Sequence, residues 1–260
     1  MSAPLSITLL GTGTSQGIPV IGCRCPVCTS PDPRDQRTRA AAFIQAGRIG
    51  LSIDIGPDFR AQMLRAGLDD VHAVLMTHEH NDHTSGLDDL RPINFLHNRN
   101  IPIYGAERTL SEMKSRFSYA FDEAYRYPGK PRVHLQAIED HPFETEGIRI
   151  IPVPVDHGDM SIYGFRVGTV AYITDAKSIP DKSKSLLQGL DVLVLNALRM
   201  RPHPTHLSLP EAIEVYEELQ PNRCYITHIS HDMGRHGEVE AGLPKGMYLG
   251  FDNLHIDAQV

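Results

Sequence analysis

The chain carries three histidines and an aspartate within six positions, directly after the apolar run 73–76. These side chains are His78, His80, Asp82 and His83. In an extended segment, side chains two positions apart point the same way, so His78 and His80 can approach one ligand together. Four such groups exceed what one tetrahedral ion takes from a short segment. The pattern therefore favours two adjacent divalent ions over a chance group of solvated histidines, in a fold that brings distant segments to the end of this strand.

Short apolar runs rich in Ile, Val and Leu alternate with helical stretches along the chain. They predict strands over 6–10, 41–45, 49–55, 73–77, 101–104, 148–155, 164–167, 170–174, 191–196, 223–227 and 247–251. Helices are expected over 57–66, 108–115, 180–188 and 209–219, the last opened by a capping box of Ser208 and Glu211. This alternation indicates the α/β class, with layered sheets flanked by helices. No low-complexity tract or Ser/Gly linker divides the chain, so we expect a single domain over 1–260.

Composition excludes several classes of protein. With 260 residues, 41 % hydrophobic and 22 % charged, the chain can bury a core, so disorder is not its main theme. The net charge of −7 argues against a sequence-independent nucleic-acid coat. No apolar run approaches the roughly 18 residues of a membrane span, and the start lacks the pattern of a secretory signal. We expect a soluble, cytoplasmic protein with no membrane partner and no stable nucleic-acid complex. The oligomeric state is left open, with a homodimer as one option.

Three of the four cysteines, Cys23, Cys25 and Cys28, fall within six residues. Thiols spaced C-x-C are poorly placed to pair with each other, and the absence of a secretory signal implies a reducing compartment. Three thiolates can hold zinc if a fourth ligand arrives from elsewhere, and such closed four-coordinate sites are structural. The alternative is three free core cysteines.

The H-x-H-x-D-H pattern after an apolar strand resembles the signature of the metallo-β-lactamase-fold hydrolases, and the resemblance runs from about residue 11 to about residue 251. It implies an αββα sandwich with a dinuclear metal site at the strand ends. Members supply a downstream histidine, a bridging aspartate and a last histidine as further ligands. Here these correspond to His157, Asp175 and His228, and Asp54 corresponds to the acid that orients the ligand loop.

The same resemblance implies two metal positions that share a hydroxide and the carboxylate of Asp175. The first ligand set is His78, His80 and His157. The second is Asp82, His83 and His228.

The cysteine cluster resembles one branch of this superfamily, the phosphoribosyl 1,2-cyclic phosphate phosphodiesterases of the carbon–phosphorus lyase pathway. That branch completes its structural zinc with a histidine three residues beyond the last catalytic histidine, which is His231 here. It also places a histidine beside the metals, which corresponds to His206, although His203 lies close to it in sequence. An imidazole there could bind a phosphoryl oxygen or protonate the departing alkoxide. Proteins of pyrroloquinoline quinone biosynthesis share a similar cysteine cluster but depart from H-x-H-x-D-H.

These resemblances imply a metal-dependent hydrolase of small cyclic or nucleotide phosphodiesters, acting by attack of the bridging hydroxide on phosphorus. His206 and Asp82 are the candidate catalytic residues, and Asp82 is also a ligand. The implied cofactors are two catalytic ions, Mn or Zn with Fe also accepted by such ligands, and one structural Zn. The alternatives are a tRNA 3′-processing nuclease, a thioester or lactone hydrolase of the same fold, and a non-enzymatic cofactor carrier. The acidic charge counts against the nuclease, and the complete ligand set counts against the carrier.

The stretch 117–131 is rich in aromatic residues, prolines and glycine. It is either a mobile lid over the site or a surface excursion whose aromatic rings pack on the body.

Overall fold

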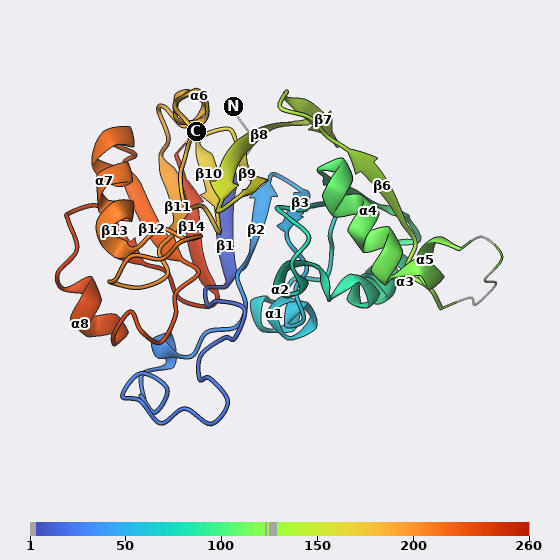
Figure 1. Cartoon of the computed structure of the whole chain (residues 1–260). Coiled ribbons are helices and arrows are strands. Elements are labelled where there is room, and N and C mark those ends of the chain that lie inside the picture. The colour runs from blue at the N-terminus through green and yellow to red at the C-terminus, as the bar shows by residue number, and fades with distance from the viewer. Residues whose placement is uncertain (1–3, 123, 125–128, 260) are drawn as a thin grey trace.

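The computed structural model describes residues 4–122, 124 and 129–259. Two seven-stranded sheets lie face to face, with helices on both outer sides (Figure 1). The first sheet has the order β14 (Leu254–Ala258), β1 (Leu5–Gly11), β2 (Ala41–Ala46), β3 (Ile49–Ile53), β4 (Ala73–Leu75), β5 (Ile101–Gly105) and β6 (Val133–Ala137). The second has the order β13 (Met247–Leu249), β12 (Arg223–Thr227), β11 (Val192–Asn196), β10 (Val170–Ile173), β9 (Met160–Val167), β8 (Ile148–His157) and β7 (Phe143–Thr145). The predicted αββα sandwich is confirmed.

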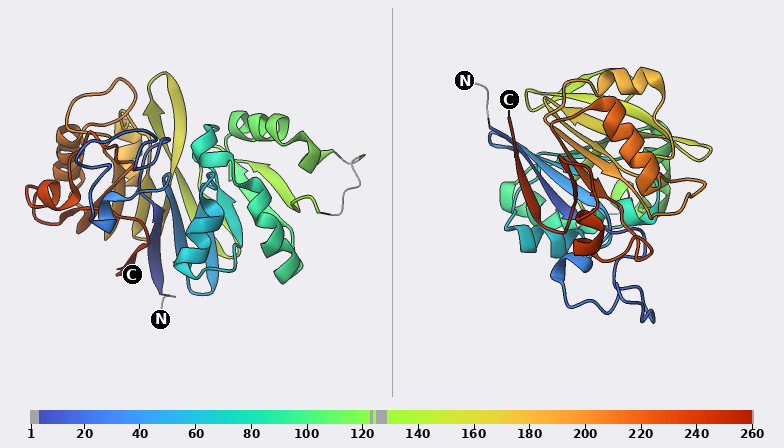
Figure 2. Two further views of the ribbon diagram at one scale, coloured as in Figure 1. Left: turned by 90° about the horizontal axis from the view of Figure 1, so that it is seen from below. Right: turned by 90° about the vertical axis from the view of Figure 1, so that its left-hand side faces the viewer.

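The helices divide between the two outer faces (Figures 1 and 2). Those on the first sheet and its connections are α1 (Phe59–Ala66), α2 (Asn81–Thr84), η2 (Leu87–Leu90), α3 (Arg91–His97), α4 (Glu107–Arg116) and α5 (Ser118–Phe121). Those on the second sheet and near the N-terminal loop are η1 (Pro33–Asp35), α6 (Asp181–Leu186), α7 (Leu209–Leu219) and α8 (His236–Glu240). None of the helices in the described part of the chain is long and apolar enough to cross a membrane.

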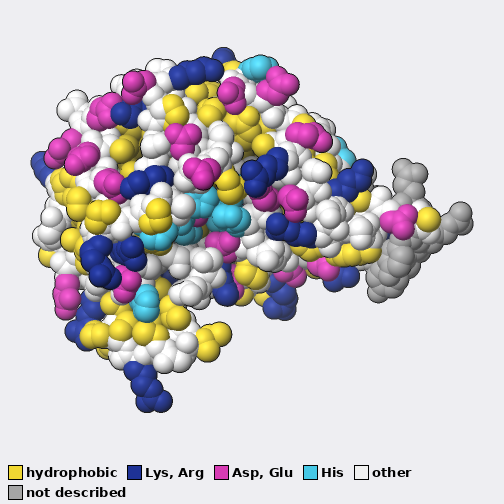
Figure 3. Space-filling view, in the orientation of Figure 1, with side chains coloured by type: hydrophobic (Ala, Val, Ile, Leu, Met, Phe, Trp, Pro, Cys, Tyr) yellow, Lys and Arg dark blue, Asp and Glu magenta, His cyan; other side chains and the backbone are white. Residues whose placement is uncertain are grey.

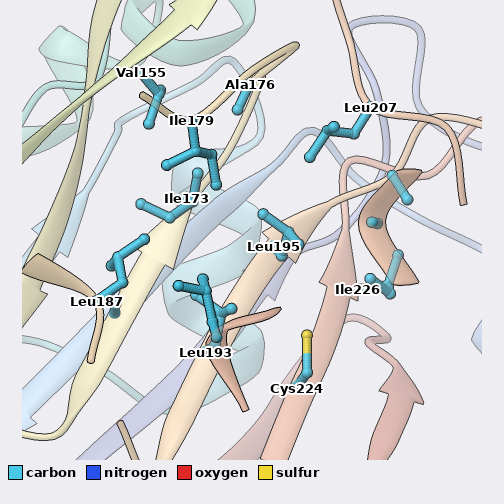
Figure 4. Close-up of a cluster of buried hydrophobic side chains, with 14 of the residues drawn as sticks. Val155, Ile173, Ala176, Ile179, Leu187, Leu193, Leu195, Leu207, Cys224 and Ile226 are labelled. Carbon is cyan, nitrogen blue, oxygen red and sulfur yellow. The ribbon is translucent and has the colours of Figure 1, made fainter. Parts of the chain in front are cut away.

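Strand β11 shows why these strands read as continuous apolar runs. Val192 and Val194 face the core between the two sheets. Leu193 and Leu195 point the other way, into the cluster beneath α6 and α7 (Figure 4). Both faces of the strand are buried, so every position is apolar. The first sheet has a matching outer layer, in which α1, α3 and α4 cover a third cluster around Phe59.

The carboxyl ends of several strands carry polar residues in unusual backbone conformations. β3 pairs in parallel with β4, and β10, β11 and β12 are also parallel, so these ends meet at one edge of each sheet. Asp54, Asp175 and His228 follow β3, β10 and β12 with φ of 62°, 59° and 55°. Residues other than glycine rarely adopt this left-handed region, and such strain collects at functional sites.

Most of the expected elements are present, with shifted ends. The predicted capping box is confirmed, because Glu211 accepts hydrogen bonds from the backbone N–H and hydroxyl of Ser208 at 2.7 and 2.6 Å. The helix expected from residue 57 begins at Phe59, after Asp58, whose carboxylate accepts the Arg39 backbone N–H. The helix expected over 180–188 is shorter. The elements that the sequence did not predict are β6, β7, β14, η1, α2, η2, α3, α5 and α8, most of them short or exposed.

Part of the aromatic stretch 117–131 lies outside the described residues, which exclude 123 and 125–128. Its first part forms α5, where the Tyr119 hydroxyl donates to Asp88 at 2.5 Å. This contact packs the start of the stretch against η2.

Candidate metal centre

Asp54 holds the loop over 77–83, which follows β4 and which we call the ligand loop. This carboxylate is fully buried, and it accepts the backbone N–H of Thr77 at 2.9 Å and the Nδ1–H of His83 at 2.7 Å. The loop also fits tightly against residue 56, because a Cβ on Gly56 would lie 2.0 Å from the Asp82 carbonyl oxygen. Asp54 therefore contacts both the backbone and one ring of the loop, and its role as the acid that orients the ligands stays a prediction.

The first group of candidate ligands comes from both sheets. His78, His80 and His157 place one ligand atom each within 4.8 Å of one another, and His78 Nε2 lies 2.9 Å from His80 Nδ1. His157 stands at the end of β8, where its Nδ1–H donates to the Thr205 carbonyl at 2.8 Å. This bond leaves the other ring nitrogen of His157 for a metal ion, which is the usual arrangement in metal sites.

The second group consists of Asp82, His83 and His228, again within 4.8 Å of one another. His83 Nε2 lies 3.3 Å from the Asp82 carboxylate. Asp175 lies between the two groups, with Oδ2 3.4 Å from His83 Nε2 and Oδ1 3.1 Å from His228 Nε2, and it also forms a group with His78 and His83. One carboxylate thus reaches both candidate positions.

The protonation of these side chains suits divalent ions. Burial, and then the neighbouring His83, lower the pKa of His78 well below its usual range. Burial also lowers the pKa of His228. The pKa of His83 is raised, because Asp54, Asp175 and Asp82 outweigh the opposing effect of its burial. Neutral imidazoles are what a metal binds, and a cation among the carboxylates would replace the proton that they hold on His83.

Unpartnered nitrogens give a second test of the fit. In the described part of the chain, His83 Nε2 and both ring nitrogens of His228 are buried without a hydrogen-bond partner. Buried polar atoms normally have partners, because leaving one unpaired costs about 1–3 kcal/mol. These residues therefore fit a metal centre, and the exposed cyan patch in Figure 3 marks where it meets the surface.

His206 lies beside both groups. Its ring stacks on His228 with centroids 4.8 Å apart, lies 4.7 Å from the His157 ring, and places Nδ1 3.6 Å from Asp175 Oδ1. Burial and the neighbouring His228 lower the pKa of His206 to about 3. His203 contacts His206 at 5.1 Å between centroids and takes no part in either candidate ligand group. The geometry therefore places His206, not His203, against the centre.

The cysteine cluster forms a separate candidate site. The Sγ atoms of Cys23, Cys25 and Cys28 lie 3.3, 3.6 and 3.5 Å from Nδ1 of His231. The backbone N–H of Cys28 lowers the pKa of the Cys25 thiol to about 6, which favours the thiolate that zinc requires. The fourth cysteine, Cys224, is buried in the core (Figure 4). Four side chains that could hold a metal ion converge here, and a closed structural zinc site stays a prediction.

The sequence and overall structure match those of known proteins. Residues 51–229 match the family described as "Beta-lactamase superfamily domain". The crystal structure of a diphosphatase from the PhnP family is 42 % identical in sequence, with a TM-score of 0.92 over 99 % of this chain and 98 % of that one. The chain belongs to the β-lactamase superfamily and, within it, to the PhnP family.

Two curated relatives extend the comparison. An octanoyltransferase of Porphyromonas gingivalis is 38 % identical over 250 residues, which are 95 % of this chain and 50 % of the relative. The chain thus spans about half the length of that relative. A ribonuclease Z of Mycobacterium bovis is 26 % identical over 75 % of this chain and 71 % of its own length.

The surroundings of the candidate metal centre include residues that the sequence did not point to. Glu79, between two candidate ligands, is buried and lies 2.6 Å from Arg108 Nε of α4. Arg116 of the same helix donates to the Glu79 carbonyl at 2.5 Å and to Asn81 Oδ1 at 3.0 Å. These contacts fasten the ligand loop to α4. In the sequence, Glu79 is marked only by its position between two candidate ligands.

A cavity of about 490 Å³ opens onto the centre. Besides candidate ligands and His206, it is lined by Ser15, Thr205, Asp159 of the β8–β9 turn and Met160 at the start of β9. Nothing in the sequence pattern placed these four residues at the site, because they carry no metal signature.

Proposed function

We propose that this chain is a metal-dependent phosphodiesterase that hydrolyses small phosphodiesters in the cavity above the candidate metal centre. The observation that supports this most strongly is the position of Asp175, which lies in reach of both ligand groups. In this proposal His78, His80 and His157 hold one divalent ion, Zn or Mn, and the second set holds the other. Two such ions supply activated water at neutral pH and neutralise charge on the phosphoryl oxygens.

In this proposal the protein's own side chains orient the ligands and contact the substrate. Asp54 and the Thr205 carbonyl hold His83 and His157 in fixed orientations, so the ligands need little reorganisation. His206 is neutral where it is buried between His157 and His228, and it donates an N–H to an oxygen of the bound phosphoryl group. The cavity of about 490 Å³ suits a small substrate, and the net charge of −7 disfavours a long polyanion such as RNA.

Hydrolysis of a diphosphate is a second candidate, favoured by the diphosphatase of the PhnP family that is similar over nearly its whole length. Both reactions require attack on phosphorus, and they differ in the leaving group. The octanoyltransferase of Porphyromonas gingivalis matches this chain over only half of its own length. Its name therefore does not assign acyl transfer to this chain.

The test is hydrolysis by the purified, metal-analysed protein of an activated aryl phosphodiester, a nucleoside diphosphate derivative and an aryl thioester. We expect turnover of a phosphorus ester that is lost on treatment with a chelator and restored by Mn²⁺ or Zn²⁺. The variant His203→Ala serves as a control for the histidine-rich loop outside the ligand groups. Turnover of the thioester with none of either phosphorus substrate would contradict the proposal.

A further inference from the structure

In the first group of candidate ligands, the ring of His80 has no support from outside the centre. His157 donates to the Thr205 carbonyl, and His78 Nδ1 lies 3.0 Å from the Thr77 hydroxyl. Among the described residues, His80 has a hydrogen-bond contact only with His78, which is itself a candidate ligand. The His80 side chain is also exposed, whereas those of His78 and His157 are buried. The direction of the His80 ring therefore depends on the backbone that carries it.

That backbone is held from its opposite face by α4. Side chains alternate in direction along an extended segment, so Glu79 points away from the two histidines that flank it. Its side chain is buried, with Oε1 2.6 Å from Arg108 Nε, and Oε2 accepts the Thr109 hydroxyl at 3.2 Å. A buried carboxylate with a cation and a hydroxyl as partners fixes the residue that precedes His80.

Arg116, in the last turn of α4, holds the peptide group itself. Its Nη1 donates to the Glu79 carbonyl at 2.5 Å and to Asn81 Oδ1 at 3.0 Å. The Glu79 carbonyl belongs to the planar peptide bond that joins Glu79 to His80. A hydrogen bond from a charged donor is about twice as strong as a neutral one, so this contact fixes the plane from which the His80 ring extends.

The helix that supplies these contacts is itself anchored. Leu110 and Met113 of α4 are buried in the outer cluster of the first sheet. The helix follows β5, and β5 pairs in parallel with β4, which leads into the ligand loop. The helix and the loop are therefore attached to neighbouring strands of one sheet, which makes α4 a rigid support.

We propose that Glu79 and Arg116 are positioning residues for His80, and that through it they set the affinity of the first ligand group for its metal ion. Neither side chain lines the cavity above the centre, so both act only through the backbone of the ligand loop. Groups that orient metal ligands in this way commonly contribute about 10- to 100-fold to metal affinity. The inference deepens the proposed function and rests on it, since it requires an ion at this group.

Competition between a chromophoric chelator and the full, Zn²⁺-loaded chain measures this affinity without any substrate. We expect Arg116→Met, which keeps the stem and removes the donors, to bind one Zn²⁺ about tenfold more weakly. Glu79→Gln should have a similar effect, because it removes the charge that pairs with Arg108. Arg116→Lys retains a charged donor and should restore most of the affinity.

A double variant tests whether the effect passes through His80. In a His80→Ala background, Arg116→Met should cause no further loss of Zn²⁺ affinity, because the ligand that Arg116 positions is gone. Residues that act independently would instead give additive losses.

Arg166→Met is the matched control. Arg166 also donates to two backbone carbonyls, those of Leu186 at 2.5 Å and Gln188 at 3.0 Å, but it lies at the end of β9 remote from His157. We expect this variant to melt at a lower temperature while it keeps the wild-type affinity for Zn²⁺. Loss of stability and loss of positioning are thereby separated.

The outcomes distinguish this inference from the proposed function. Wild-type affinity in both Arg116→Met and Glu79→Gln, additive losses with His80→Ala, or an equal loss in Arg166→Met would each overturn the inference alone. A wild-type chain that binds no ion at either ligand group would overturn the proposed function together with it.

Discussion

At the scale of single residues, the centre depends on side chains that act through their neighbours. Asp54 never reaches the cavity, yet it holds Thr77 and His83 together. Thr174 acts in the same way, donating its hydroxyl to Asp175 at 2.6 Å. Asp54 could be singled out because the resemblance to the metallo-β-lactamase-fold hydrolases implies an orienting acid at the end of this strand. The sequence could not predict which threonines bond to ligands, because threonine is equally common in strands without a function.

His206 is the residue whose replacement tests the proposed contact with the phosphoryl group. We expect His206→Ala to lower kcat by about 10²-fold, the value of one such hydrogen-bond donor, and by the same factor on aryl and alkyl phosphodiesters. The equality follows because a neutral imidazole donates a hydrogen bond but does not supply a full proton. Steady-state kinetics on the two substrates make the comparison, with His203→Ala as the neighbouring control. A far larger loss on the alkyl substrate would instead make His206 the acid that protonates the leaving oxygen.

At the scale of elements, burial decided what could be predicted. Strand β11 is apolar from Val192 to Leu195, and α7 begins with a capping box, so both can be predicted from the sequence. Strand β6 is mostly exposed, and its sequence Val-His-Leu-Gln-Ala carries no continuous apolar signal. It is a strand because β5 pairs with it in parallel over five residues. Tertiary pairing of that kind has no local signature.

The cysteine loop offers a prediction at this scale. We expect Cys25→Ser to lose about one metal ion per chain and to melt at a lower temperature, since metal binding contributes to folding free energy. Activity measured at low temperature should persist in part, because the cysteine cluster shares no ligand with the other candidate groups. Cys224→Ser is the matched control: it places a hydroxyl in the core, so it should melt lower while keeping its full metal content. Metal analysis beside a melting curve decides the matter, and a Cys25→Ser protein with unchanged metal content and melting would rule out a zinc site there.

At the scale of the whole molecule, the centre lies where the two sheets meet. His78 and His83 follow a strand of the first sheet, whereas His157 ends a strand of the second sheet and Asp175 and His228 follow two others. The cluster over 78–83 could be predicted from the residues themselves, and the resemblance to the metallo-β-lactamase-fold hydrolases supplied the more distant candidates. The resemblance also implied their partition into two sets, but the distances within 4.8 Å depend on how the sheets pack, which the sequence does not give.

The central claim is that one carboxylate organises two metal ions for hydrolysis. Asp175→Asn keeps the size of the side chain while removing its charge, so the most direct test is metal content and phosphodiesterase turnover measured on the same sample of this variant. We predict turnover lower by about 10³-fold or more and fewer than two ions retained by the two ligand groups, with the fold intact by its circular dichroism spectrum. Near-normal turnover with both ions still bound would contradict the account.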